Sequence, residues 1–252
     1  GHMPENITTY PWFTLGGNAV VASFWVTKSA QLLLLLVSIV ALFVQIFSKS
    51  YLAEDPKIGR YYSYLHLFIG SMTLLVLTDQ IYIFYGAWEL VGACSYLLIS
   101  FWHQKDAPIK AAKKAFLLNR IGDIALLFGL IGLSSYFGTN VFSAMQGSAP
   151  ALIGIAVIAG GIGKSAQFPL MSWLPDAMEG PTPASALIHA ATMVAAGVFV
   201  GIRVFPFIGE EAHLFMGVIG AISLVSGALF ALFPNDIKKA LAYSTISQLG
   251  LM

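Results

Sequence analysis

The sequence has few charged residues and almost no cysteine. Only 10% of its 252 residues are charged, whereas soluble globular chains carry about 25%. Its single cysteine, Cys94, has no second cysteine for an intrachain disulfide. No Cys or His cluster has metal-ligand spacing, and Gly160–Gly163 lies inside a hydrophobic run rather than in a phosphate-binding loop. These absences, with a net charge of only +1, argue against a metal centre, a nucleotide site, nucleic-acid binding and a sizeable soluble domain.

Long apolar runs are what the sequence has instead. Hydrophobic residues make up 58% of the chain, and the mean hydropathy is +0.79. A transmembrane helix needs about 20 mostly apolar residues. Seven segments qualify or come close, at 29–47, 63–79, 80–101, 115–137, 151–174, 182–205 and 213–233, and an eighth begins near Asp236. We therefore predict an all-α polytopic membrane protein with seven crossings and a partial eighth.

The two ends of the chain give further expectations. Residues 1–28 mix prolines and glycines with polar residues, so we expect an extended extramembrane segment. Gly1-His2-Met3 resembles the scar of tag cleavage, and the chain stops at Met252 within a helical pattern. We expect it to be a fragment of a larger membrane protein.

The basic residues predict the orientation of the helices. With alternating crossings, one side receives nine of them, namely Lys49, Lys57, Arg60, Lys105, Lys110, Lys113, Lys114, Lys238 and Lys239. The other side receives two, Lys28 and Arg203. Cytoplasmic loops carry the excess of Lys and Arg. We therefore predict an outside N-terminus and inside loops at 48–62, 102–114, 175–181 and 234–238.

Lys164 is the least expected residue in this pattern. It follows the apolar run 151–163 and precedes Pro169. An ammonium in hydrocarbon costs at least about 2.5–3.5 kcal/mol, and such residues are functional by default. The glycines before it and the proline after it predict a broken helix, a feature of transporter sites. The alternative is a lysine that snorkels to the interface.

Glu89 is a matching carboxylate in the third apolar run. We predict that it pairs with Lys164, either as a structural ion pair or as a charge that controls the lysine's protonation. Arg120 and Asp123 lie three residues apart, which places them on one face of a helix. We expect them to form a self-neutralising pair, with a role in positioning the pathway as the alternative.

Two histidines lie in apolar segments. His189 follows Ser185 by four residues and precedes Thr192 by three, which gives a polar stripe. It is either a proton relay, because histidine titrates near neutral pH, or a hydrogen-bonded bundle residue. His66, near the inner end of its segment, is expected to pack at the interface.

Four charged residues belong to the inner loops. Lys238 and Lys239 are explained by topology alone, although a place at the pathway mouth or as the next relay is the alternative. Asp176 and Glu179 are expected in a solvated loop between two prolines.

Four runs together carry a resemblance: Trp88–Ile99, Lys114–Asp123, Gly163–Val194 and Asp236–Gly250. They closely resemble the antiporter-like membrane subunits of respiratory complex I, best the subunit L family, over about residues 10–252. The same core occurs in the large subunits of multi-subunit Na⁺/H⁺ antiporters and in related ion-translocating complexes.

The resemblance implies a fold of two inverted five-helix repeats, each with a broken helix. It divides the chain into an N-terminal segment 1–28, a leading helix and loop 29–62, a first repeat 63–205 and the start of a second repeat 206–252.

The resemblance also assigns roles to residues. The family's proton-transfer residues fall on Glu89, Lys164, His189 and Lys238. Arg120 and Asp123 match its intervening helix, and Lys239 is a supporting residue.

The implied activity is proton translocation in the membrane arm of an NADH:quinone oxidoreductase. NADH, flavin, iron–sulfur clusters and quinone would belong to partner subunits, and this chain would hold no cofactor and no metal. The resemblance places the chain in a bacterial cell membrane rather than a mitochondrial inner membrane, among other membrane-arm subunits. An ion antiporter subunit without redox partners, or a non-pumping scaffold, remain alternatives.

Overall fold

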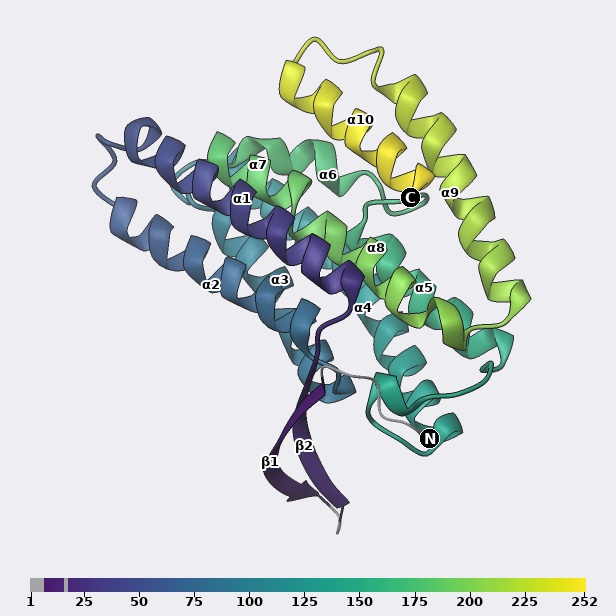
Figure 1. Ribbon diagram of the computed structural model, residues 1–252. Coiled ribbons are helices and arrows are strands. Elements are labelled where there is room, and N and C mark those ends of the chain that lie inside the picture. The colour runs from purple at the N-terminus through teal and green to yellow at the C-terminus, as the bar shows by residue number, and fades with distance from the viewer. Residues whose placement is uncertain (1–6, 16–17) are drawn as a thin grey trace.

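The computed structural model describes residues 7–15 and 18–252, and it is mainly helical (Figure 1). Gly1-His2-Met3 lies outside the described residues. The helices are α1 (Lys28–Tyr51), α2 (Ile58–Leu77), α3 (Ile81–Ile99), α4 (Asp106–Phe137), α5 (Ala151–Lys164), α6 (Trp173–Asp176), α7 (Thr182–Ala190), α8 (Met193–Val204), α9 (Glu210–Phe230) and α10 (Ile237–Leu251). Three 3₁₀ turns join them, η1 (Phe142–Ala144), η2 (Ala177–Glu179) and η3 (Phe205–Phe207).

A β-hairpin precedes the helices. Strands β1 (Ile7–Leu15) and β2 (Asn18–Trp25) pair antiparallel. They project from one end of the bundle (Figure 1). We expected an extended segment here, and the structure gives it a more specific form, with backbone bonds satisfied between two strands.

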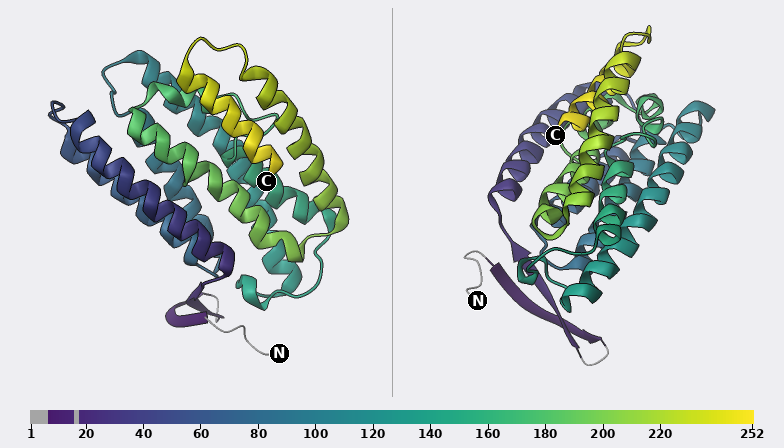
Figure 2. Two further views of the ribbon diagram at one scale, coloured as in Figure 1. Left: turned by 45° about the horizontal axis from the view of Figure 1, so that its top comes forward. Right: turned by 90° about the vertical axis from the view of Figure 1, so that its right-hand side faces the viewer.

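The helices meet the requirements of a membrane protein. Five of them within the described residues are long and apolar enough to cross a membrane: α1, α3, α4, the pair α7–α8 taken together, and α9. Helix α5 is apolar but shorter. The long helices run side by side, with α9 and α10 forming the outermost pair next to α8 (Figure 2). The chain is therefore an integral, multi-pass membrane protein.

Helix α4 is longer than its apolar run. It starts at Asp106 rather than at residue 115, so it has 32 residues and a length of about 48 Å. A bilayer core is only about 30 Å thick. Its first turns, which carry Lys110, Lys113 and Lys114, therefore continue beyond the apolar span.

Two spanning segments are interrupted. The expected break near Lys164 is present: α5 ends at Lys164, and Ala166 has φ of 49°. A second break, which we did not predict, separates α7 from α8 at Ala191 and Thr192. This second break follows His189 by two residues. Lys164 and His189 therefore each lie next to a helix end.

The glycines of α5 have a different role from the predicted one. They lie within a regular helix rather than loosening it. A Cβ at Gly163 would lie 3.2 Å from the Cα of Gly122 on α4, so these positions allow two backbones to pack closely. This contact fixes α5, and with it Lys164, against α4.

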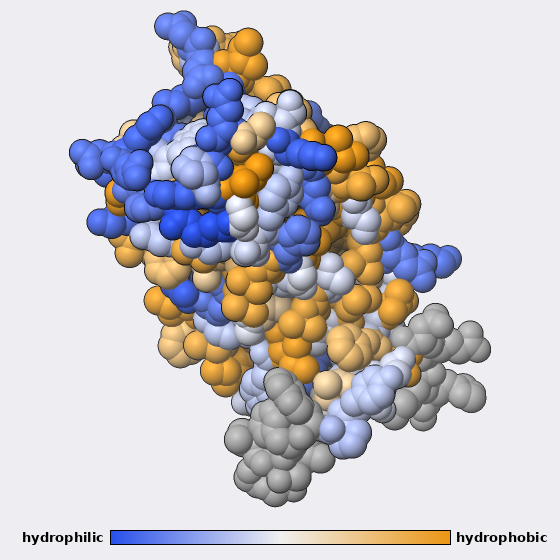
Figure 3. Space-filling model, turned by 90° about the vertical axis from the view of Figure 1, so that its left-hand side faces the viewer, coloured by the Kyte–Doolittle hydropathy of each residue, from blue (hydrophilic) through white to orange (hydrophobic). Residues whose placement is uncertain are grey.

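The basic loops gather at one end of the bundle. The connections α1–α2, α3–α4, η2–α7 and α9–α10 lie at the end opposite the hairpin (Figure 1). Hydrophilic residues cover this end, and hydrophobic residues cover the flank below it (Figure 3). The grouping of loops agrees with the alternation that we used for the orientation.

Candidate functional site

Lys164 is completely buried at the C-terminal end of α5, with 0% of the residue exposed. Its ammonium points toward α3 and α4. A Cβ on Gly92 of α3 would lie 2.6 Å from Nζ, so the absence of a side chain at Gly92 creates the space for this group. Nζ has no hydrogen-bond partner among the described residues. Burial to this degree excludes the snorkelling alternative.

Asp123 and Trp88 surround this ammonium. Asp123 Oδ1, on α4, lies 3.6 Å from Lys164 Nζ. The same oxygen accepts a hydrogen bond from Trp88 Nε1 at 2.6 Å. Lys164 Nζ also lies 5.4 Å from the centre of the Trp88 ring, which is within the range of a cation–π interaction. Sequence reasoning did not single out Trp88, although it directly precedes Glu89.

The predicted pairings of Glu89 and Arg120 are wrong. Glu89 pairs directly with Arg120 of α4, not with Lys164. Asp123 pairs with Lys164, so Arg120 and Asp123 do not neutralise each other. The reason is that i,i+3 spacing puts two residues on one helix face but does not stop each from reaching a different neighbouring helix.

The four side chains form a charge cluster between α3, α4 and α5: Glu89, Arg120, Asp123 and Lys164. Two carboxylates balance two cations, so the cluster is formally neutral. Buried charges are stable only when they are paired. Asp123, the ionic partner of Lys164, lies beyond hydrogen-bond distance, so Lys164 carries an ammonium without a hydrogen bond among the described residues.

Side-chain hydrogen bonds join the segment around the end of α5 to neighbouring elements. Ser165 Oγ donates to the carbonyl of Val194 at the start of α8 (2.9 Å), and Trp173 Nε1 donates to the carbonyl of Gly163 (3.1 Å). Gln167 Nε2 donates to the carbonyl of Leu249 on α10 (3.1 Å). These bonds fix the segment that follows the end of α5 against α8 and α10.

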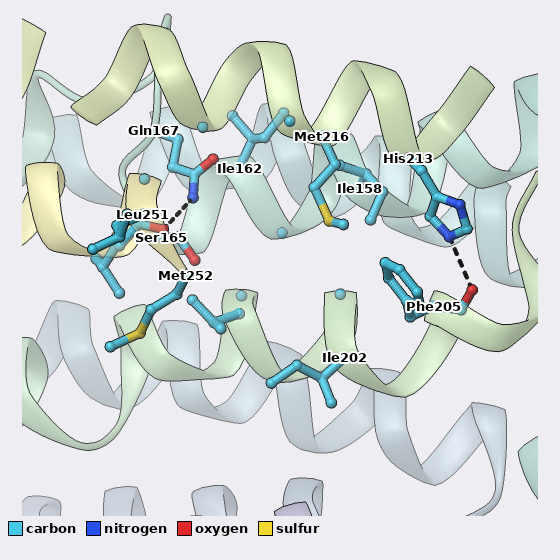
Figure 4. Close-up of a pocket in the computed structure, with 18 of the residues that line it drawn as sticks. Ile158, Ile162, Ser165, Gln167, Ile202, Phe205, His213, Met216, Leu251 and Met252 are labelled. Carbon is cyan, nitrogen blue, oxygen red and sulfur yellow. Dashed lines mark hydrogen bonds between the residues drawn. The ribbon is translucent and has the colours of Figure 1, made fainter. Parts of the chain in front are cut away.

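A cavity of about 610 Å³ lies beside this break, between α5, α8 and α9. Ser165 and Gln167 line one end of it, and His213 lies at the other, where it bonds the carbonyl of Phe205 (Figure 4). Apolar residues such as Ile162 and Met216 line the space between them. The lining is mainly apolar, so the cavity is not a continuous polar path.

His189 lies on a different side of the bundle from the charge cluster. It lines a cavity of about 530 Å³ between α1, α8 and α10. Three polar residues of α10 line the same cavity, Ser244, Thr245 and Gln248. His189 Nε2 is buried and has no hydrogen-bond partner among the described residues. The spacing i, i+1, i+4 on α10 was the signal that could have identified these residues.

Lys238 lies near His189. It is half-buried at the start of α10 and within electrostatic range of the imidazole. Its ammonium donates to the carbonyls of Met178 (2.6 Å) and Gly180 (3.4 Å) in the η2 turn. Lys238 therefore ties the second part of the chain to the loop before α7.

We had expected a solvated loop around η2, but this loop is paired and partly buried. Asp176 pairs with Lys114 at 2.6 Å, and Glu179 lies 3.9 Å from Lys239. Its apolar members, such as Met178, are buried. His66, by contrast, is exposed and bonds the carbonyl of Tyr62.

A second buried ion pair lies at the hairpin end, and sequence reasoning missed it. Arg203 and Asp79 are 3.9 Å apart, with exposed side-chain fractions of 3% and 0%. Arg203 also donates to the carbonyls of Val76 (2.9 Å) and Thr78 (3.2 Å). Asp79 accepts two hydrogen bonds from Ser143. The pair joins α8 to the end of α2 and to η1.

Asp79 lies in the turn between α2 and α3, outside the spanning helices. Burial raises the pKa of its carboxyl above the usual range, against the opposing effects of the Ser143 hydrogen bonds and the Arg203 charge. Among the described residues, no group of three or more His, Cys, Asp or Glu side chains could hold a metal ion.

Similar proteins were found by sequence and by structure. The chain is 46% identical to NAD(P)H-quinone oxidoreductase chain 5 of Synechocystis over 96% of its length and 38% of that protein. It is 44% identical to NADH-quinone oxidoreductase subunit L of Mycobacterium tuberculosis, over 96% of this chain and 40% of that one. The chain thus spans about two fifths of the length of these relatives.

A solved structure of the Mrp complex from Dietzia sp. is also similar. One of its chains superposes with a TM-score of 0.89 and 32% identity, covering 97% of this chain and 28% of the other. Residues 12–62 match the family described as the N-terminus of NADH-ubiquinone oxidoreductase (complex I) chain 5. Residues 78–252 match the transmembrane family of NADH:quinone oxidoreductase and Mrp antiporter subunits, and the chain belongs to this family.

Proposed function

We propose that this chain translocates protons across a membrane, as part of the membrane arm of an NADH:quinone oxidoreductase. The observation that carries the proposal is Lys164: a fully buried lysine with a carboxylate at 3.6 Å and no hydrogen bond among the described residues. Burying an ammonium has a large desolvation cost, so a purely structural lysine would be expected to offset that cost with hydrogen bonds. The names of the two quinone oxidoreductase relatives support the choice of host complex.

Lys164 takes up and releases the proton in this proposal. When Asp123 carries its charge, the ammonium form of Lys164 is favoured. Glu89 acts on Lys164 through the cluster rather than by direct contact, because Arg120 holds it. A change in the Glu89–Arg120 pairing would alter the net charge that Lys164 experiences, and the proton would then be retained or released.

His189 and Lys238 form the second half of the proposed path. They lie on the α10 side of the bundle, where Ser244, Thr245 and Gln248 add hydroxyl and amide groups. The proton passes from Lys164 to His189 across the break at Ala191 and Thr192, and from there toward Lys238. The Lys164 ammonium points toward α3 and α4 rather than toward His189. Transfer of the proton between them would therefore need intervening water.

The remaining parts of the proposal concern the larger assembly. Residues 63–205 form the first five-helix repeat, with 206–252 starting a second, and Lys239 supports the path from its pair with Glu179. The basic end faces the cytoplasm of a bacterial cell, and the N-terminus faces the periplasm. NADH, flavin, iron–sulfur clusters and quinone are bound by partner subunits.

The test is Lys164→Met in the full complex, reconstituted into vesicles with proton translocation and quinone reduction both measured. We expect translocation through this subunit to be lost while the complex still assembles. Lys114→Met is the matched control, because it removes a half-exposed lysine that also pairs with an aspartate, Asp176, but lies outside the charge cluster. Wild-type stoichiometry in Lys164→Met would refute the assignment.

Ion antiport without redox partners is the second candidate, favoured by the likeness to a chain of the Mrp complex. The same residues would carry it, so co-purification with quinone-reducing subunits distinguishes the two. A non-pumping scaffold is the third candidate, suggested by the number of buried ion pairs. Double neutralisation, with Asp123→Asn and Lys164→Met together, would then destabilise assembly but leave transport intact.

A further inference from the structure

Trp88 interacts with both members of the ion pair between Lys164 and Asp123. Its indole N–H donates to Asp123 Oδ1 at 2.6 Å, and its ring faces Lys164 Nζ at 5.4 Å. The residue is fully buried, and Phe84 stacks on it with ring centroids 6.0 Å apart. Its side chain therefore has a fixed place beside the charges.

The hydrogen bond and the ion pair use the same oxygen. Lys164 Nζ lies 3.6 Å from Asp123 Oδ1, beyond the usual range of about 2.7–2.9 Å for a charge-assisted hydrogen bond. Trp88 Nε1 lies at 2.6 Å from that atom. The donor that reaches Oδ1 is thus the indole, and the ammonium is left without a hydrogen bond among the described residues.

We propose that Trp88 is a positioning residue that keeps Lys164 and Asp123 apart, so that the lysine stays free to release its proton. The indole occupies the carboxylate oxygen, and its π face stabilises the ammonium without binding it directionally. If Lys164 bonded Asp123 directly, the proton would be held in a charge-assisted bond, which is about twice as strong as a neutral one. This inference rests on the proposed function of Lys164 as the proton carrier.

Other charges around Lys164 do not replace this role. The charged groups that act on it are Asp123, Glu89 and Arg120, all on α3 and α4. Arg120 is engaged with Glu89 and stacks over Phe116 at 4.6 Å. Trp88 is therefore a neutral group that lies beside both the lysine and its nearest carboxylate.

The test is Trp88→Phe in the full complex. We expect the distance between Lys164 Nζ and Asp123 Oδ1, measured in a structure of the variant, to contract to about 2.8 Å. We expect the rate of proton translocation to fall roughly tenfold, which corresponds to about 1.4 kcal/mol, and its decline at alkaline pH to move to higher pH. Trp102→Phe is the matched control, because it deletes an indole hydrogen bond to another carboxylate, Asp55, outside the cluster (3.2 Å).

An isosteric replacement protects the test against a folding defect. If Trp88→Phe does not assemble, benzothienylalanine at position 88 removes the N–H and keeps the shape of the ring. An unchanged distance with an unchanged pH profile, in either variant, would overturn the proposal. The distance between Lys164 Nζ and Asp123 Oδ1 does not depend on transport. If it contracts in Trp88→Phe while the separate variant Lys164→Met still pumps, the proposed function is refuted and the positioning role of Trp88 remains.

Discussion

Gly92→Ala tests whether Lys164 occupies the place that the structure gives it. The new Cβ would lie 2.6 Å from Lys164 Nζ, whereas ordinary contact starts at 3.4 Å. The ammonium must therefore retreat by about 0.8 Å, and it is the far end of a flexible side chain, so the helices themselves need not move. Asp123 Oδ1 now lies 3.6 Å from Nζ, and a displacement of the same length away from this oxygen would weaken their attraction by roughly 0.8 kcal/mol at an effective dielectric constant of 20.

This loss corresponds to about a fourfold change in the ratio of protonated to neutral lysine. We expect Gly92→Ala to change the translocation rate in reconstituted vesicles by a factor of this order or larger, with normal assembly. Gly86→Ala on the same helix is the control, because its Cβ would meet nothing within 4 Å, and alanine there stabilises the helix by about 0.5–1 kcal/mol. Equal behaviour of the two variants would refute the placement of Lys164 beside Gly92.

Two further predictions concern the ion pair at the hairpin end. Arg203→Met leaves Asp79 as a buried charge without its cation, so we expect about 3–5 kcal/mol of destabilisation, measured as a loss of thermal stability of the purified complex; an unchanged unfolding temperature would contradict the pairing. Asp79 has a pKa raised by burial above its ordinary value of 3.8, so its contribution to stability is fully present below pH 3.8 and is lost as pH rises through the folded-state pKa. Asp79→Asn should therefore flatten the dependence of unfolding temperature on pH above pH 3.8, and a slope equal to that of the wild type would show that another group controls it.

The sequence was a good guide to elements whose signals are local. The membrane class follows from apolar runs of sufficient length, and the break after Lys164 follows from its position between an apolar run and Pro169. The start of the last helix was also predicted near Asp236: α10 begins at Ile237, and Asp236 is its N-cap, with a side chain that accepts from the backbone N–H of Lys238.

The failures concern information that is not local. Glu89 pairs with Arg120 rather than Lys164 because the rotation of α3 against α4 and α5 selects the partners, and periodicity within one helix does not determine that rotation. The break between α7 and α8 occurs at Ala191 and Thr192, without the glycine or proline that usually marks one. The pair Asp79–Arg203 joins residues more than a hundred positions apart, which no sequence spacing indicates.

Lys164→Arg, measured as protons translocated per electron in the reconstituted complex, tests the central claim most directly. Arginine keeps the positive charge beside Asp123 but does not release a proton at any working pH. If Lys164 carries the proton, the ratio must fall to that of Lys164→Met even though the ion pair is preserved and quinone reduction shows an assembled complex. A wild-type ratio in Lys164→Arg would contradict the account, because a fixed charge would then be sufficient.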